Sequence, residues 1–307
     1  MRLLILILLF PFIAQGQIVR THPYYKPFAA ACTPLLLDTY SGAAAAYSLR
    51  KLDCDYAGSA IRVRRSSDNT ESDIGFTSGG DLDTSALKTF VGTSSSDTGY
   101  VAKWYSQINS YDVDQSTAGY QPYIIRGGVI ERQNNNVCVF FNGTKRLTRA
   151  SFLHSLSLTS ATLFQVTKNV ADPPASDPVT GGVIMVGASD NTPSHFPYTD
   201  ATIYESFGTT VRKAYNPAPS LTNKNLYCVT SASGDFNAYL NNSNIYTTSS
   251  NSVAFQNLTF YIGAVFYFSS WWYYNGRVFE ILIFDSAFNS SNRNGASNNI
   301  NTYYSIY

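Results

Sequence analysis

The chain has 307 residues; aromatic residues make up 15% of it, charged residues only 13%, and the formal net charge is +1. A charge this close to zero gives no electrostatic reason to expect nucleic acid as a partner. Ser, Thr, Asn, Gly and Tyr are abundant while Lys, Glu and Met are scarce, which is typical of β-strands and tight turns. We therefore expect an all-β protein with one or two short helices.

The N-terminus has the pattern of a secretory signal. Arg2 precedes an apolar run over residues 3–13, and Ala14-Gln15-Gly16 provides the small residues of a cleavage site. The run is short for a membrane span. We interpret residues 1–16 as a signal peptide that is removed before Gln17, with an uncleaved anchor as the alternative. A secreted, extracellular or virion-surface protein with no remaining membrane span is therefore expected.

The next segment, residues 17–40, contains three prolines and little periodicity, which favours an N-terminal extension. From there to the C-terminus we find no repeat of 20–50 residues and no linker marked by a change of composition. Residues 41–307 are therefore predicted to form one domain.

Short helices are expected in two places. Residues 41–52 contain good helix formers, and residues 83–91 could be capped by Asp83 or Thr84. Elsewhere, short alternating runs bounded by turn residues predict strands. These runs are 59–64, 72–76, 100–105, 137–141, 161–167, 183–186, 201–204, 226–231, 237–240, 258–263 and 277–284.

Four cysteines allow three pairings. Cys32 and Cys54 are candidates for a disulfide that would clip the N-terminal segment, whereas Cys138 and Cys228 lie in apolar strands where free thiols are equally plausible. No cysteines have C-x-x-C spacing and the three histidines are isolated, so neither a soft-ligand metal site nor a cofactor is expected. The oxygen donors Asp190, Asn191 and Asp200 could ligate calcium, but no spacing supports it.

Two parts of the chain carry a resemblance to a known fold. Residues 40–105 alternate strand-like runs with turns, and the C-terminal third reads L-Y-C-V-T, then L-T-F-Y-I-G-A, then N-G-R-V-F-E-I-L-I-F-D. Between them stand S-H-F-P-Y-T-D and T-I-Y at residues 194–204. These segments resemble the arabinofuranosidase-B catalytic domain and related laminin-G-like jelly rolls, including lectin-like phage tail and virion structural proteins. The resemblance implies a concanavalin A-like β-sandwich (jelly roll).

That fold hosts both glycosidases and non-catalytic modules, so the carboxylates are informative. Retaining glycosidases use two carboxylates about 5 Å apart. The resemblance implies a nucleophilic Glu just before an Ile-Tyr strand. Its position falls at Asp200 or Ala201, with Glu205 beyond the Ile-Tyr pair. Strand alternation predicts Asp200 and Glu205 on opposite faces.

The second acid of that family would follow the Ile-Gly strand, where residues 264–269 contain no carboxylate. The nearest downstream acid, Glu280, stands in an apolar strand and is predicted to be a paired structural carboxylate. The candidates for catalysis are therefore Glu205 and Asp200 alone.

Seven aromatic residues occupy the nine positions from Phe266 to Tyr274. Aromatic rings stack on sugars, although such rings also fill cores and subunit interfaces. The candidate carbohydrate-binding residues are Trp271, Trp272, Tyr273, Tyr274, His195 and Asp200. We expect a secreted or virion-surface, lectin-like, non-catalytic module that binds glycan or polysaccharide, or that acts as a structural subunit in a homo-oligomer or virion. The alternative is a glycoside hydrolase resembling α-L-arabinofuranosidase B.

Overall fold

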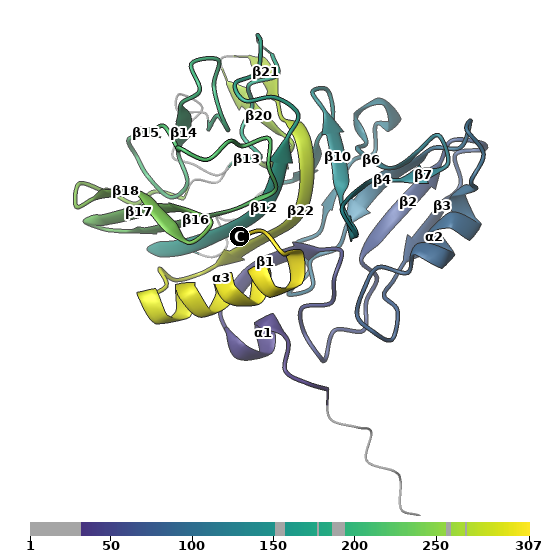
Figure 1. Cartoon of the computed structure of the whole chain (residues 1–307), viewed down its shortest axis with the longest axis horizontal. Coiled ribbons are helices and arrows are strands. Elements are labelled where there is room, and N and C mark those ends of the chain that lie inside the picture. Colours follow the sequence, from purple (N-terminus) through teal and green to yellow (C-terminus); the bar gives the residue numbers. More distant parts are fainter. Residues whose placement is uncertain (1–31, 151–156, 177, 186–193, 256–258, 268) are drawn as a thin grey trace, which may run out of the picture. The chain divides into compact units, whose positions relative to one another are not determined.

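Antiparallel strands dominate the computed structural model, which describes residues 32–150, 157–176, 178–185, 194–255, 259–267 and 269–307 (Figure 1). The α-helices are α1 (Leu36–Thr39), α2 (Thr84–Val91) and α3 (Ser290–Tyr304), and a short 3-10 helix, η1, spans Ala118–Tyr120. The strands of the first half are β1 (Ala43–Ser48), β2 (Ile61–Arg65), β3 (Glu71–Ile74), β4 (Gly99–Trp104), β5 (Val113–Asp114), β6 (Tyr123–Arg126), β7 (Val129–Ile130), β8 (Arg132–Gln133), β9 (Asn136–Val137), β10 (Val139–Asn142) and β11 (Leu147–Arg149). Those of the second half are β12 (Ser160–Asn169), β13 (Ile184–Met185), β14 (Ile203–Glu205), β15 (Lys213–Tyr215), β16 (Asn225–Ala232), β17 (Asp235–Leu240), β18 (Ser243–Thr248), β19 (Phe260–Ile262), β20 (Ala264–Tyr267), β21 (Ser270–Tyr273) and β22 (Asn275–Phe284).

The long strand β22 organises the sheet. It pairs antiparallel with β1, β10 and β12. From β12 the sheet continues through β16 and β17 to β18, and from β10 it continues through β6 to β4 and onward to β13. Apolar side chains from both of these wings meet in one core, as in two sheets packed face to face. The predicted all-β sandwich is confirmed.

Both faces of the sheet around β12 and β22 are covered. Leu163 and Ile283 join the core between the wings, whereas their neighbours Phe164 and Leu282 join a second core together with Ile300 of α3. Helix α3 runs along this outer face beside β1 and β22 (Figure 1). Burial on both faces explains the nearly continuous apolar sequence I-L-I-F in β22.

The helix predictions had mixed outcomes. The predicted helix at 83–91 is α2, and the Asp83 carboxylate caps it by accepting hydrogen bonds from Ser85 N and Ala86 N. The helix predicted at 41–52 is wrong, because Ala43–Ser48 forms strand β1. Residues 44–48 are buried where β1 pairs with β22, and this tertiary pairing overrides the helix preference of the alanines. Helix α3, rich in Asn and Ser, was not predicted.

A buried ion pair joins α3 to the sheet. Arg50 Nε and Nη2 donate to the two carboxylate oxygens of Glu280 over 2.8 and 3.0 Å. The same carboxylate accepts hydrogen bonds from Ser48 Oγ at 2.8 Å and from Tyr304 Oη at 3.2 Å. The prediction that Glu280 is a paired structural carboxylate is confirmed.

Cys32 and Cys54 are disulfide-bonded, while Cys138 and Cys228 are free and buried in the second core. Burial raises the pKa of both free thiols, so these two thiols are held in their unreactive protonated form. None of the helices among the described residues is long and apolar enough to cross a membrane.

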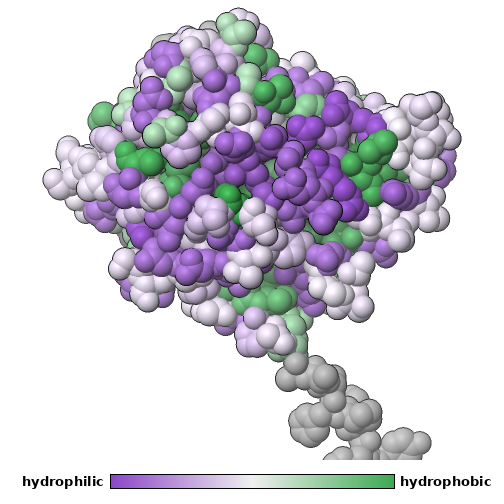
Figure 2. Space-filling view, in the orientation of Figure 1, coloured by the Kyte–Doolittle hydropathy of each residue, from purple (hydrophilic) through white to green (hydrophobic). Residues whose placement is uncertain are grey.

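Figure 2 shows that hydrophilic side chains cover much of the face drawn in Figure 1, with only small, separate apolar patches between them. Patches of this kind are ordinary on a protein surface and do not by themselves call for a partner.

Candidate carbohydrate-binding site

Two small hairpins carry most of the residues singled out in the sequence. Strand β14 pairs with β15, and β20 pairs with β21. In Figure 1 both hairpins are drawn above β12 and β16, with β14 and β15 at the upper left and β20 and β21 at the top. Gly263 leads from β19 into β20 with a φ of +85°, and a Cβ added there would lie 2.1 Å from a Phe141 ring carbon. Glycine is therefore needed at the Ile-Gly position.

Strand alternation divides the predicted aromatic residues between two faces. Trp271 lies against Tyr261 and Phe266, with ring centroids 5.1 and 4.8 Å away. Trp272 points to the other side of β21, where its ring centroid is 5.8 Å from that of His195. Tyr274 is only 1% exposed, and its hydroxyl donates to Asn169 Oδ1 over 2.8 Å. The inclusion of Tyr274 among ligand-binding residues was wrong, because it is a core residue.

The first of these surfaces, the Trp271 face, consists of Tyr120, Arg146, Tyr261, Trp271 and Tyr273. The Arg146 guanidinium lies over the rings of Tyr120 and Trp271, 3.8 and 4.0 Å from their centroids. Its Nη1 also donates to Tyr273 Oη over 2.9 Å. Cation–π contacts and this hydrogen bond hold the rings in fixed positions. Because Trp271 and Tyr273 remain partly exposed, the face is a rigid aromatic platform open to solvent.

Neither Arg146 nor Tyr120 was among the sequence candidates. They precede Trp271 by more than a hundred residues; Tyr120 ends a short helical turn over residues 118–120, and Arg146 lies just before β11. No local pattern marks an arginine that stacks on distant rings. Only the fold brings these residues together.

The second surface, the His195 cluster, consists of His195, Tyr198, Asp200, Tyr204 and Trp272. The His195 ring centroid lies 4.8 Å from that of Tyr198 and 5.9 Å from that of Tyr204. His195 Nδ1 is 2.7 Å from the Thr180 carbonyl oxygen, which only accepts, so Nδ1 carries the proton of this hydrogen bond. The histidine is 5% exposed and therefore forms the base of the cluster.

Asp200 closes the outer side of this cluster. Its Oδ2 accepts a hydrogen bond from Tyr204 Oη and its Oδ1 accepts one from Thr202 N, both over 2.9 Å. Partial desolvation acts to raise the pKa of Asp200, but these hydrogen bonds outweigh it and hold the pKa below its usual value. Asp200 is therefore an exposed carboxylate that stays ionised.

Glu205 has the opposite environment. It is 5% exposed; its Oε1 accepts from Phe207 N over 2.8 Å and from Ser194 Oγ over 3.2 Å. Its Oε2 accepts from Tyr227 Oη over 2.9 Å, and Tyr227 shares a further hydrogen bond with the hydroxyl of Tyr215. Desolvation raises the pKa of Glu205, and these hydrogen bonds compensate only in part.

The two candidate acids do not face one another. Ile203 and Glu205 point inward from β14, while Tyr204 points outward and contacts Asp200, as strand alternation predicts. Asp200 lies in the turn before β14 and contacts Tyr204 on its outer face, whereas Glu205 is buried on its inner face, so the two carboxylates do not flank a shared site. The positions expected for a second acid begin with Ala264 and Val265, whose side chains are fully buried.

The calcium hypothesis gains no support. Asp190 and Asn191 lie outside the described residues. Within the described ranges, no three His, Cys, Asp or Glu side chains are grouped so that they could hold a metal ion.

No protein family model matches the chain, and no curated protein sequence matches it either. Solved structures do. An arabinofuranosidase complexed with arabinofuranosyl-α-1,2-xylobiose superposes with a TM-score of 0.61 at 16% identity, covering 84% of this chain and 62% of that chain. A GH54 α-L-arabinofuranosidase soaked with a cyclic sulfate inhibitor gives a TM-score of 0.58 at 16% identity and the same coverage. A Trypanosoma rangeli sialidase in complex with sialic acid reaches only 0.47 at 12% identity, covering 66% of this chain and 31% of that chain.

The likeness to the two arabinofuranosidases shows a shared fold. The chain spans less than two thirds of the length of the two arabinofuranosidases that it matches. At 16% identity these two comparisons show the fold alone, and they do not bear on a virion or oligomer role.

Proposed function

We propose that this protein acts on carbohydrate, and that the Trp271 face binds a glycan. The observation that carries this proposal is the partly exposed pair Trp271 and Tyr273, held in place by Arg146. Sugar rings present apolar C–H surfaces that stack on such rings, while hydroxyls form hydrogen bonds to the neighbouring guanidinium and phenol groups. Fixing the rings before binding lowers the entropic cost of binding.

The proteins that share the fold suggest which glycan to test first. The two arabinofuranosidase structures hold arabinofuranosyl-α-1,2-xylobiose and a cyclic sulfate inhibitor. We therefore propose arabinofuranosyl-bearing polysaccharide as the first ligand to test. The signal-like N-terminus adds the proposal that binding takes place outside the cell or at a virion surface.

A glycan array with the full chain tests the binding proposal. Trp271→Ala and Tyr273→Ala should each reduce retention about tenfold or more, since one stacked ring contributes roughly 1–3 kcal/mol, taking aromatic stacking on bases as a guide. Tyr307→Ala is the matched control, because Tyr307 is half exposed and does not belong to the Trp271 face. Unchanged retention by both platform variants, with folding intact, would reject this face as the binding site.

Hydrolysis is the second candidate function, and the fold comparisons favour it. The raised pKa of Glu205 suits a general acid, which must hold its proton near neutral pH. Its buried carboxyl group and the outward direction of Asp200 mean that these two residues do not make a two-carboxylate site in this structure.

Release of nitrophenol from 4-nitrophenyl α-L-arabinofuranoside tests this candidate. A hydrolase that uses Glu205 should lose at least a hundredfold in rate on Glu205→Gln, in line with the usual contribution of a general acid. The Asp200→Asn variant should keep its rate, because Asp200 lies on the other face of β14. Absence of release by folded wild-type protein would reject hydrolysis of this substrate class while leaving glycan binding to be judged on the array.

A further inference from the structure

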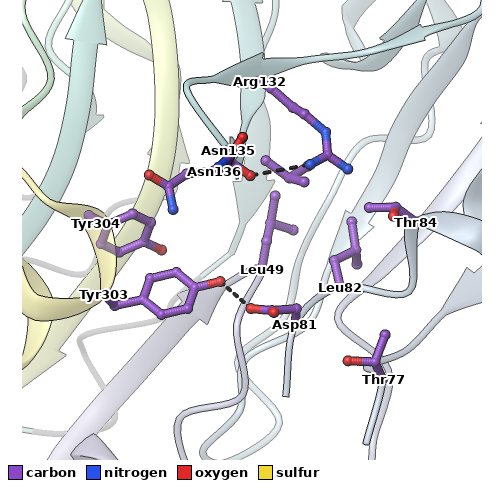
Figure 3. Close-up of a pocket in the computed structure, with 11 residues that line it drawn as sticks. Leu49, Thr77, Asp81, Leu82, Thr84, Arg132, Asn135, Asn136, Tyr303 and Tyr304 are labelled. Carbon is purple, nitrogen blue, oxygen red and sulfur yellow. Dashed lines mark hydrogen bonds between the residues drawn. The ribbon is translucent and has the colours of Figure 1, made fainter. Parts of the chain in front are cut away.

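A polar cavity lies away from both the Trp271 face and the His195 cluster. It has a volume of about 370 Å³ and lies between the C-terminal end of α3, the β8–β9 hairpin and the segment that precedes α2 (Figure 3). It shares no residue with the Trp271 face or the His195 cluster. The volume is near the lower end of the range of small-ligand sites, roughly 300–1,000 Å³, and so suits one small molecule.

One wall of the cavity is an aromatic ring that is fixed from two sides. The Tyr303 hydroxyl donates to Asp81 Oδ1 over 2.5 Å, a contact that is visible in Figure 3. The Arg50 guanidinium lies 4.7 Å from the centroid of the same ring, and Arg50 is itself held by the buried carboxylate of Glu280. A ligand stacking on Tyr303 would therefore meet a preorganised surface.

The other walls combine apolar and polar groups. Leu49, Leu82 and Val137 provide apolar contacts, and Asp81, Arg132 and Asn135 provide polar ones (Figure 3). Within the described part of the chain, Asp81 Oδ2 and the side-chain amide of Asn135 have no protein hydrogen-bond partner, so both can bind a ligand. Arg132 uses one nitrogen, Nη1, to donate to the Asn135 carbonyl oxygen over 3.2 Å.

The chemistry of the cavity selects among ligand classes. One carboxylate and one guanidinium leave it without net charge, so it offers no advantage to a strongly ionic ligand. A fixed aromatic ring, an apolar floor and hydrogen-bonding groups of both kinds match a molecule with C–H surfaces and many hydroxyls. We propose that this cavity binds one neutral monosaccharide unit, stacked on Tyr303 and hydrogen-bonded through its hydroxyls to Asp81 Oδ2 and the Asn135 amide.

The test uses the full chain and a panel of methyl glycosides of arabinofuranose, galactose, glucose, mannose and N-acetylglucosamine. Saturation-transfer NMR identifies the sugar that binds, and titration calorimetry gives its affinity. Asp81→Asn keeps the shape of the side chain and an acceptor for Tyr303, but it weakens the charged hydrogen bond to the sugar. It should lower the affinity about tenfold, as loss of one charge-assisted hydrogen bond does. Asn135→Ala should give a similar loss.

Asp114→Asn is the matched control, because Asp114 is exposed on β5 and lies outside the cavity; it should bind like wild type. Trp271→Ala should leave binding in this cavity unchanged, which separates this proposal from that of the Trp271 face. Wild-type affinity in a folded Asp81→Asn variant, or binding of none of the five glycosides, would overturn the proposal. Preferential binding of glycine or arginine over every sugar would overturn it as well, by identifying a zwitterion site.

Discussion

Glu205 and Glu280 are both almost fully buried, but they belong to different sheets, the β14–β15 hairpin and the large sheet, and have different partners. Glu280, 1% exposed, is paired with Arg50 through two hydrogen bonds on the α3 side. Glu205, 5% exposed, is held by Tyr227, Ser194 and the Phe207 amide on the inner side. Within the described residues, no cation forms an ion pair with Glu205.

The two glutamates show that one protein can stabilise a buried carboxyl group in two different ways. A buried carboxylate needs either an opposite charge or a proton, because an isolated buried charge is very costly. An arginine supplies the first solution at Glu280. Hydroxyl and amide donors supply only part of the compensation at Glu205, so its pKa is raised. The first carboxylate stabilises the attachment of α3 through Arg50 and Tyr304, whereas burial raises the pKa of the second.

The largest effect on the free energy of unfolding is expected at the ion pair between Arg50 and Glu280. Glu280→Gln leaves the Arg50 guanidinium buried without its anion, and loss of one partner of a buried pair costs about 3–5 kcal/mol. Urea unfolding followed by circular dichroism measures this change in the free energy of unfolding. A double variant, Arg50→Met with Glu280→Leu, should recover most of the loss, since no charge then remains unpaired. A cost below about 1 kcal/mol for Glu280→Gln would contradict a structural role for this pair.

A smaller, pH-dependent effect is expected at Glu205. Its pKa is higher in the folded than in the unfolded chain, so the neutral carboxyl group stabilises the fold fully below the unfolded value, about 4.3. That contribution is lost as the pH rises through the folded pKa. As the pH rises from acidic to alkaline, wild type should therefore lose stability relative to Glu205→Gln. The loss should be about 1.4 kcal/mol for each unit by which folding raises the pKa of Glu205.

Unfolding curves of both proteins between pH 4 and 9 measure this difference directly. Glutamine resembles the protonated acid, because its NH₂ group can donate to Tyr227 Oη while Tyr227 donates onward to Tyr215. A stability difference between wild type and variant that is the same at every pH would contradict the raised pKa.

The fold and the direction of the β14 side chains could be predicted because they follow from local patterns. Alternation alone placed Ile203 and Glu205 on one face and Tyr204 on the other. The apolar run around Glu280 indicated a paired carboxylate, although only the structure identified Arg50 as its partner. The helix predicted over residues 41–52 was wrong because the burial of Ala43–Ser48 against β22 depends on a strand more than two hundred residues away.

Long-range contacts also explain what was missed in the candidate sites. Seven of the nine residues 266–274 are aromatic, so residue type does not distinguish the core residue Tyr274 from the partly exposed Trp271. Arg146 lacks a motif because stacking depends on geometry rather than on spacing. Helix α3 contributes Tyr303 to the cavity in Figure 3. The helix was not predicted because most of its residues are polar, and the few buried residues that attach it to the sheet form no clear apolar pattern.

The smallest effect on stability is expected at a third carboxylate, Asp73, which is also paired with an arginine, Arg62, but at the surface. Arg62 donates to both oxygens of Asp73 over 2.8 and 3.0 Å, nearly the geometry of Arg50 with Glu280. The side chains of Arg62 and Asp73 are, however, 40% and 39% exposed, so water screens the pair and replaces it when it is broken. Asp73→Asn should therefore cost less than about 1 kcal/mol by urea unfolding at pH 7. A cost equal to that of Glu280→Gln would mean that paired geometry, rather than burial, sets the contribution of these carboxylates.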